Sequence, residues 1–166
     1  ECTQILARRQ PAAGDLRLVL ATTKSVRDLE RIGDEAERVA NMVRHAFDNE
    51  ASVKAFKGLL SLGEHVKELL HATLNTYARM NSRAAIKNMR KDQAIDDEYA
   101  RVVVRLIEFM KKTPDNIPDG LDVLWAARSL ERIGDHCINI CENVIYFVEG
   151  QDVRHLAIEE VKEQLS

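Results

Sequence analysis

A six-residue stretch, Leu-Glu-Arg-Ile-Gly-Asp, occurs twice in this chain, at residues 29–34 and again at 130–135. The two copies lie 101 residues apart, and Arg27 and Arg128 match at the same separation. Six identical residues in a row at a fixed offset indicate an internal duplication with a period near 101 residues. The fold must therefore contain two versions of one structural unit.

Helix breakers are scarce, with 7 Gly and 3 Pro in 166 residues, which favours long helices. The pattern predicts helical segments at 1–9, 15–47, 52–80, 83–112, 118–149 and 157–165. The expected start and stop signals are Asp15, Ser52, Ser82, Pro118 and Gly150.

The four longest segments have roughly 30 residues each, or about 45 Å at 1.5 Å per residue. Helices of this length joined by short turns pack antiparallel as a bundle. In the last of them, apolar side chains recur on one face at helical spacing: Leu130, Ile133, Cys137, Ile140, Cys141, Val144 and Val148. The fold class is predicted to be all-α.

Counted back from its second copy, the repeating unit holds three helices, so we predict a tandem repeat of three-helix bundles. Residues 1–50 would be the remainder of the first bundle, namely the end of its second helix and its third. Residues 51–150 would be a complete second bundle, and 151–166 a C-terminal tail. The first bundle is then incomplete in this chain, and we expect the intact protein to be longer at its N-terminus by roughly half a repeat.

Each copy of the motif places two carboxylates one turn apart, Glu30 with Asp34 and Glu131 with Asp135. Like charges at this spacing destabilise an isolated helix by a few tenths of a kcal/mol, and a mid-helix Gly costs about 1 kcal/mol more. A plain solvated face is the ordinary explanation for such a pair. Here, however, the unfavourable combination occurs twice, and the neighbouring helix carries a third pair, Asp92 and Asp96, at the same spacing.

In an antiparallel bundle, two such pairs on adjacent helices can converge, and four converged carboxylates repel unless a cation lies among them. Ligation by oxygen alone favours Mg, Mn, Ca or iron over zinc. Gly33 and Gly134 would allow a metal ion or solvent to approach the helix backbone. Further along the same helices, Glu37, Asn139 and Glu142 are candidate secondary ligands.

The paired motifs resemble the PhoU family of phosphate-regulon regulators. Other segments that read like this family are Arg8–Pro11, Asp15–Arg17, Ala127–Ser129, Asn139–Glu142 and Gly150–His155. The resemblance implies two three-helix bundles with multinuclear metal sites holding Mg, Mn or Fe. It assigns the second site to Asp92, Asp96, Glu131 and Asp135, and the first to Glu30 and Asp34. The partner motif of the first site would fall before residue 1, which leaves that site incomplete here.

The resemblance also implies a role. Members of the family are cytoplasmic regulators without enzymatic activity, often homodimers, that couple a phosphate ABC transporter, through its ATPase subunit, to a sensor histidine kinase. When phosphate is plentiful they restrain phosphate uptake and the starvation response. Composition agrees with a cytoplasmic protein: three cysteines are too few for a disulfide framework, and no apolar run approaches a membrane span. A net charge of −3 gives no reason to expect nucleic acid as a partner.

Two other classes of protein and one other ligand are alternatives to a metal-binding regulator. A ferritin-like di-iron enzyme needs a Glu-x-x-His motif on each of two helices, and only Glu68 with His71 fits. A helical adaptor that binds no metal would share the regulatory role. Phosphate binding is not favoured, because no Gly-rich loop opens a helix and the carboxylates would repel the anion.

The sequence also predicts where several single residues near the motifs lie. His136 is expected at the surface rather than as a peripheral metal ligand, and Cys137 and Cys141 in the core. Trp125 and Phe109 are expected in the core or at an interface. We expect Arg31 and Arg132 to pair with a neighbouring helix or a partner.

Overall fold

A computed structural model describes residues 2–9, 11–46, 50–112 and 114–164. Three long helices dominate it: α2 (Ala13–Ala46), α3 (Glu50–Arg79) and α6 (Ile117–Glu149). Between them lie α4 (Ser82–Met89), α5 (Asp92–Lys112) and a single 3₁₀ turn (Pro114–Asn116), with α1 (Cys2–Arg9) and α7 (Ile158–Gln164) at the two ends. The described residues contain helices and no strand, so the all-α prediction is confirmed.

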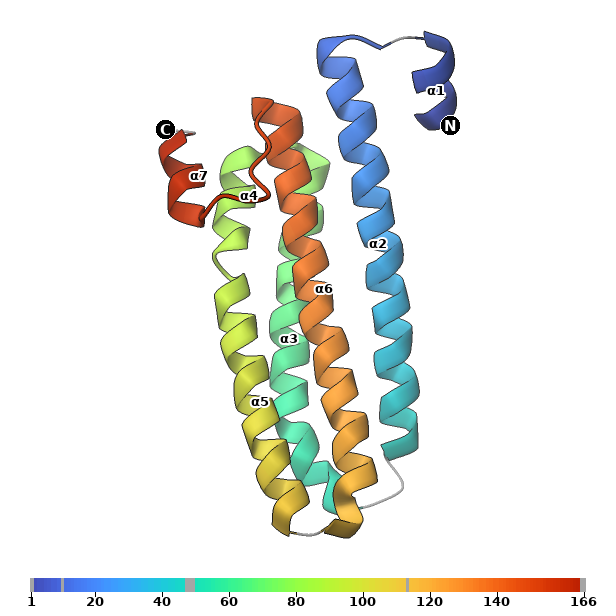
Figure 1. The fold of residues 1–166 in the computed structure, drawn as a ribbon, viewed down its shortest axis with the longest axis vertical. Coiled ribbons are helices and arrows are strands. Elements are labelled where there is room, and N and C mark those ends of the chain that lie inside the picture. Colours follow the sequence, from blue (N-terminus) through green and yellow to red (C-terminus); the bar gives the residue numbers. More distant parts are fainter. Residues whose placement is uncertain (1, 10, 47–49, 113, 165–166) are drawn as a thin grey trace.

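Helix α6 lies at the centre, with α3, α4 and α5 on one side and α2 on the other (Figure 1). Consecutive residues of α6 are buried, among them Ala126 with Ala127 and Ile140 with Cys141. Neighbours in a helix lie 100° apart, so this helix buries more than one face. The predicted apolar face is part of that surface, and Val148, which is 39% exposed, falls outside it.

The helix predicted over 83–112 is wrong as a single element, because the chain breaks into α4 and α5 at Arg90 and Lys91. The Lys91 amide donates to the Asn88 carbonyl across the break, and the buried Asn88 side chain donates to Thr76 Oγ1. The two helices also join different apolar clusters: Ala85 and Met89 pack with Val153 and other C-terminal residues, whereas α5 packs into the main core. No Gly or Pro marks the junction.

The predicted helix ends agree in part with the structure. Gly150 ends α6 in the left-handed region at φ 75°, and Pro118 lies in its first turn. Asn81, rather than the predicted Ser82, caps α4, since its side chain accepts from the Ala84 amide. Asp15 and Ser52 lie inside the first turn of α2 and of α3 rather than before them.

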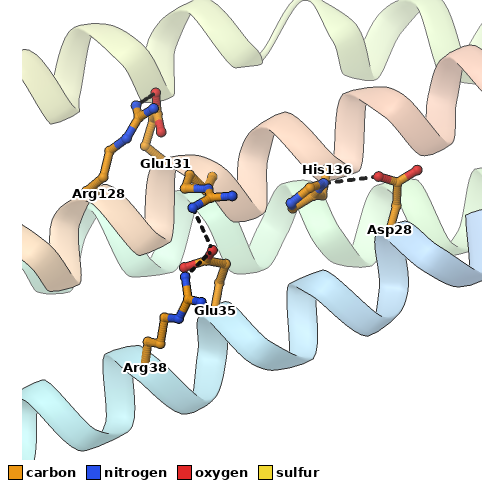
Figure 2. A network of polar contacts seen from close by, with 7 residues as sticks. Asp28, Glu35, Arg38, Arg128, Glu131 and His136 are labelled. Atoms are coloured by element: carbon orange, nitrogen blue, oxygen red, sulfur yellow. Dashed lines mark hydrogen bonds and ion pairs between the residues drawn. The ribbon is translucent and has the colours of Figure 1, made fainter.

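Helices α2 and α6 are the two equivalents of the duplicated sequence, and they pack antiparallel through a polar seam (Figure 2). On α6, the buried polar residues Ser129, His136 and Asn143 are spaced by seven. On α2, Asp28 and Glu35 are buried with the same spacing. A seven-residue repeat keeps one line of side chains facing a partner helix.

Two carboxylates of α2 hold this seam together. Asp28 Oδ1 lies 3.0 Å from His136 Nδ1 and accepts from the Asn139 amide at 3.2 Å. Glu35 Oε1 accepts from Arg38 at 2.9 Å and pairs with Arg132 at 3.2 Å. The expected interhelical pairing is thus confirmed for Arg132. A buried carboxylate without a partner is strongly unfavourable, so these contacts fix the register of the two helices.

Glu35→Gln removes the charge that meets Arg38 and Arg132 at a side chain only 4% exposed. We expect unfolding in urea to show a loss of about 1–2 kcal/mol, the size of a charge-assisted hydrogen bond. Glu37→Gln, at an exposed position on the same helix, is the control and should stay within about 0.5 kcal/mol of the parent. Equal stability of the two variants would show that the seam does not depend on this charge.

Candidate metal centre

The two predicted acidic pairs of the second repeat lie on adjacent helices. Asp92 is the first residue of α5, and Asp96 follows one turn later. Glu131 and Asp135 lie in the middle of α6, which packs directly against α5. Asp92, Asp96 and Glu131 are partly buried, while Asp135 is exposed. The stripe on α6 therefore faces a neighbouring helix as well as solvent.

Gly134 lies on the side of α6 that faces α5. It is buried, and a Cβ placed on it would lie 3.5 Å from Asp92 Oδ1 and 3.6 Å from Ile95 Cγ2. These are ordinary van der Waals distances, so packing does not require a glycine here. Its lack of a side chain instead leaves the α6 backbone open toward the Asp92 carboxylate.

The electrostatics show that the four carboxylates act on one another. Burial raises the pKa of Asp92 to about 6, and repulsion from Asp96, Asp135 and Glu131 adds to the effect. Burial also raises the pKa of Glu131, with a further contribution from Asp135 and, more weakly, Asp96. The pKa of Asp135 is raised by burial and by Asp96. Asp92, Glu131 and Asp135 are therefore each harder to ionise than an isolated carboxyl group.

One cation of the protein itself counters this repulsion. Arg128, one turn before Glu131, pairs with Glu131 Oε1, and its charge lowers the pKa of both Glu131 and Asp135 (Figure 2). Two carboxylate oxygens are left over: Asp92 Oδ1 and Glu131 Oε2 are buried and have no hydrogen-bond partner. Buried oxygens in this state call for a cation or a donor.

The donor set fits a hard cation, since all four groups are carboxylates. The arrangement itself is not a finished site: in the described part of the chain, no three His, Cys, Asp or Glu side chains surround a common point as metal ligands would. Metal binding at Asp92, Asp96, Glu131 and Asp135 stays a prediction. A bound cation would neutralise the repulsion and occupy the two unpartnered oxygens.

The first-repeat pair has a different environment. Glu30 and Asp34 are both exposed on α2, and no atom lies within 4 Å of a Cβ placed on Gly33. The structure thus leaves open the face that α5 covers in the second repeat. Glu37, the candidate secondary ligand of this pair, is also exposed.

The other two candidate ligands face α2. Asn139 donates its amide hydrogen to Asp28, and Glu142 lines a pocket with the same aspartate. Burial is the main reason why the pKa of Glu142 is raised to about 7. The charges of Asp28 and Asp92 contribute more weakly to that raised pKa. The role of Asn139 and Glu142 as secondary ligands stays a prediction.

The prediction that His136 lies at the surface is wrong: it is 5% exposed, because α2 covers that side of α6. Trp125 is 56% exposed, so of its two predicted positions the core is excluded and the interface stays a prediction. The seven-residue spacing of Ser129, His136 and Asn143 was the signal that a second helix packs there.

The cysteine prediction is confirmed. Cys137 and Cys141 are fully buried in α6, and burial raises the pKa of their thiols to about 12 and about 11. Both side chains therefore serve as core residues, packed in the two apolar clusters.

The fold and this site define a class, namely helical bundles that carry duplicated carboxylate motifs. A family model described as "PhoU domain" matches residues 1–43 and 59–144. A relative from Pseudomonas aeruginosa, a "phosphate-specific transport system accessory protein PhoU homolog", is 42% identical over 99% of this chain and 68% of its own length. The Escherichia coli K12 protein of that system, PhoU, is 41% identical with the same coverage.

Solved structures agree. The crystal structure of PhoU from Pseudomonas aeruginosa superposes with a TM-score of 0.85 at 42% identity, covering 90% of this chain and 72% of that one. The phosphate transport system regulatory protein PhoU from Streptococcus pneumoniae gives a TM-score of 0.80 at 30% identity, covering 92% and 70%. The chain belongs to the PhoU family.

Asp92→Asn tests the repulsion among the carboxylates in metal-free protein. The raised pKa means that the native Asp92 holds its proton more tightly than in the unfolded chain. Proton binding by Asp92 therefore stabilises the folded state fully below pH 3.8, and this stabilisation is lost as the pH rises through about 6. Above that range the variant should be more stable than the parent by on the order of 1 kcal/mol, allowing for screening at a half-exposed group.

Thermal unfolding of both proteins in chelator from pH 4 to 8 measures this effect. The advantage of the variant should shrink toward acidic pH. Asp34→Asn, at the exposed counterpart of Asp135 in the first repeat, is the control and should show no such trend. A variant that is less stable than the parent at pH 8 would contradict the repulsion.

Gly33→Ala and Gly134→Ala form a matched pair at equivalent positions of the repeat. Replacing Gly33, which has open space around it, should stabilise metal-free protein by about 1 kcal/mol through helix propensity. The gain at Gly134 should be smaller, because the new methyl group lies against Asp92 Oδ1 and shields it further from water. Chemical denaturation in chelator compares the two, and a larger gain at Gly134 would contradict this interpretation.

Proposed function

We propose that this protein is an accessory regulator of a phosphate transport system. The match over 99% of the chain to proteins named phosphate-specific transport system accessory proteins supports this most directly. The proposed action is negative regulation: with phosphate plentiful, the protein restrains uptake and the starvation response. It does so by binding the ATPase subunit of a phosphate ABC transporter and a sensor histidine kinase.

The form of the molecule suits a protein that works through binding. Long helices present extended surfaces along their length. Several large apolar side chains on these surfaces are exposed, including Val26, Val104, Ile107 and Trp125. No helix in the described ranges is long and apolar enough to cross a membrane. A homodimer in the cytoplasm is part of the proposal.

The carboxylates of α5 and α6 enter the proposal as a metal centre for Mg, Mn or Fe. A cation held by Asp92, Asp96, Glu131 and Asp135 would tie the two helices together beside Gly134. The surface that α5 and α6 share would then have one geometry for partners to bind. This proposal makes metal content and partner binding depend on the same residues.

The test is the double variant Asp96→Ala/Asp135→Ala. Elemental mass spectrometry on tag-free protein should find stoichiometric metal in the parent and none in the variant. Biolayer interferometry against the purified transporter ATPase subunit and the cytoplasmic part of the kinase should show at least tenfold weaker binding by the variant.

The matched control is Glu30→Ala/Asp34→Ala, which removes the same motif from the exposed face of α2. It should keep the metal and the partners. Undiminished partner binding by a metal-free double variant would leave a helical adaptor whose acidic stripe binds no metal. Absence of binding to both partners by the parent would refute the regulatory role itself.

A further inference from the structure

A pocket of about 260 Å³ lies between α2 and α6. It lies on the side of α6 that faces away from α5. Helix α2 contributes Lys24, Arg27 and Arg31, which share one face at helical spacing. The remaining lining residues are Asp28 of α2, Asn139, Glu142 and Asn143 of α6, and Arg154 of the segment after α6. Four cationic and two acidic side chains thus surround one small space.

Two of the cations have no carboxylate of their own. Among the described residues, no ion pair or hydrogen bond joins Arg27 or Arg31 to another side chain. By contrast, Arg154 is held by Asp152, and Lys24 lies 5.5 Å from the centre of the Tyr146 ring.

The duplication shows that this is a property of the pocket and not of these residue types. The equivalents of Arg27 and Arg31 in the second repeat are Arg128 and Arg132, and each of those pairs with a glutamate. Arg132 meets Glu35 of the opposite helix. The residue equivalent to Glu35 in the second repeat is His136, so Arg31 meets no carboxylate across the same seam.

His136 has a second effect on the pocket. It lies 3.0 Å from Asp28 Oδ1, and Asn139 donates to the same oxygen. The one acidic residue of α2 in this pocket is therefore engaged by α6 rather than by the arginines. The exchange of Glu for His between the repeats thus leaves Arg31 without a carboxylate across the seam, and Arg27 beside it also lines the pocket without an ion pair.

We propose that this pocket binds free inorganic phosphate. Paired guanidinium groups present planar, forked donors that match a tetrahedral oxyanion, and the Asn143 and Lys24 side chains add further donors. At about 260 Å³ the space suits a small ion with some water, being below the usual size of pockets for larger ligands.

Glu142 in the same lining adds a carboxyl acceptor, which favours an anion that can also donate a hydrogen bond. Sulfate at neutral pH offers only acceptors and has no proton to donate to Glu142. Inorganic phosphate keeps a proton even at pH 8 and can donate it in a hydrogen bond to that carboxylate. A phosphate ester, whose second pKa is about 6, has lost this proton at pH 8. The site is thus expected to prefer the free ion over the phosphoryl group of a larger molecule.

This binding needs no Gly-rich loop, which was the reason why the sequence did not favour it. The pocket lies between α2 and α6, outside the group of four carboxylates, and only a minor contribution from the charge of Asp92 reaches Glu142 in its lining. The proposal goes beyond the regulatory role, and its failure would be visible in ion binding alone, without any partner protein.

Isothermal titration calorimetry of the whole chain at pH 8 in chloride buffer, with inorganic phosphate, tests the proposal. Arg27→Gln/Arg31→Gln should weaken phosphate binding at least tenfold. Both side chains are exposed, and circular dichroism should show an unchanged fold. Arg83→Gln/Arg101→Gln removes the same charge from exposed positions outside the pocket and should leave the affinity within about twofold.

Sulfate and glycerol 3-phosphate complete the experiment. Both should bind at least tenfold more weakly than phosphate, and Glu142→Gln should reduce the preference of phosphate over sulfate. Phosphate binding that is absent in the parent, or equal in both arginine variants, would overturn the proposal. Equal or tighter binding of sulfate or of the ester would overturn it as a site for free phosphate.

Discussion

The packing of α2 against α6 through buried carboxylates is the contact on which the rest of the structure depends. A carboxylate such as Glu35, with a 4% exposed side chain, can be buried only where donors reach it, and Arg132 and Arg38 do so in one register. Apolar seams tolerate sliding far better, because one methyl group can replace another. The polar seam therefore sets where each residue of α6 lies, including the face that it turns toward α5.

Duplication followed by divergence explains how one motif came to serve two environments. Arg132 is paired across the seam, while Arg31 is not. The single exchange of Glu35 for His136 at equivalent positions redirects Asp28 and frees the arginine. Small changes between repeats thus produce sites that the shared sequence does not contain.

The sequence predicted the features that depend on local pattern. Helix spacing and the Gly150 cap gave α2, α3 and α6, and the repeated motif placed Glu131 and Asp135 beside α5. It failed where the outcome depends on which helices meet. The break at Arg90 follows from packing into two clusters, with no Gly or Pro to mark it. His136 is buried only because α2 covers it. The absence of an ion pair at Arg27 and Arg31 likewise depends on which residues α6 places opposite them.

Helix α6 separates two sites of opposite charge. Toward α5 it presents Glu131 and Asp135 to two more acidic groups, and Arg128 is the main cation that offsets them. Toward α2 it closes a pocket in which cations outnumber acids. The carboxylates toward α5 are partly buried, where uncompensated charge costs stability, and a bound cation would remove that cost. The arginines toward α2 are exposed, so an anion would add an attraction there rather than relieve a burial cost. Because both faces belong to one rigid helix, whatever shifts α6 along α2 alters the two sites together.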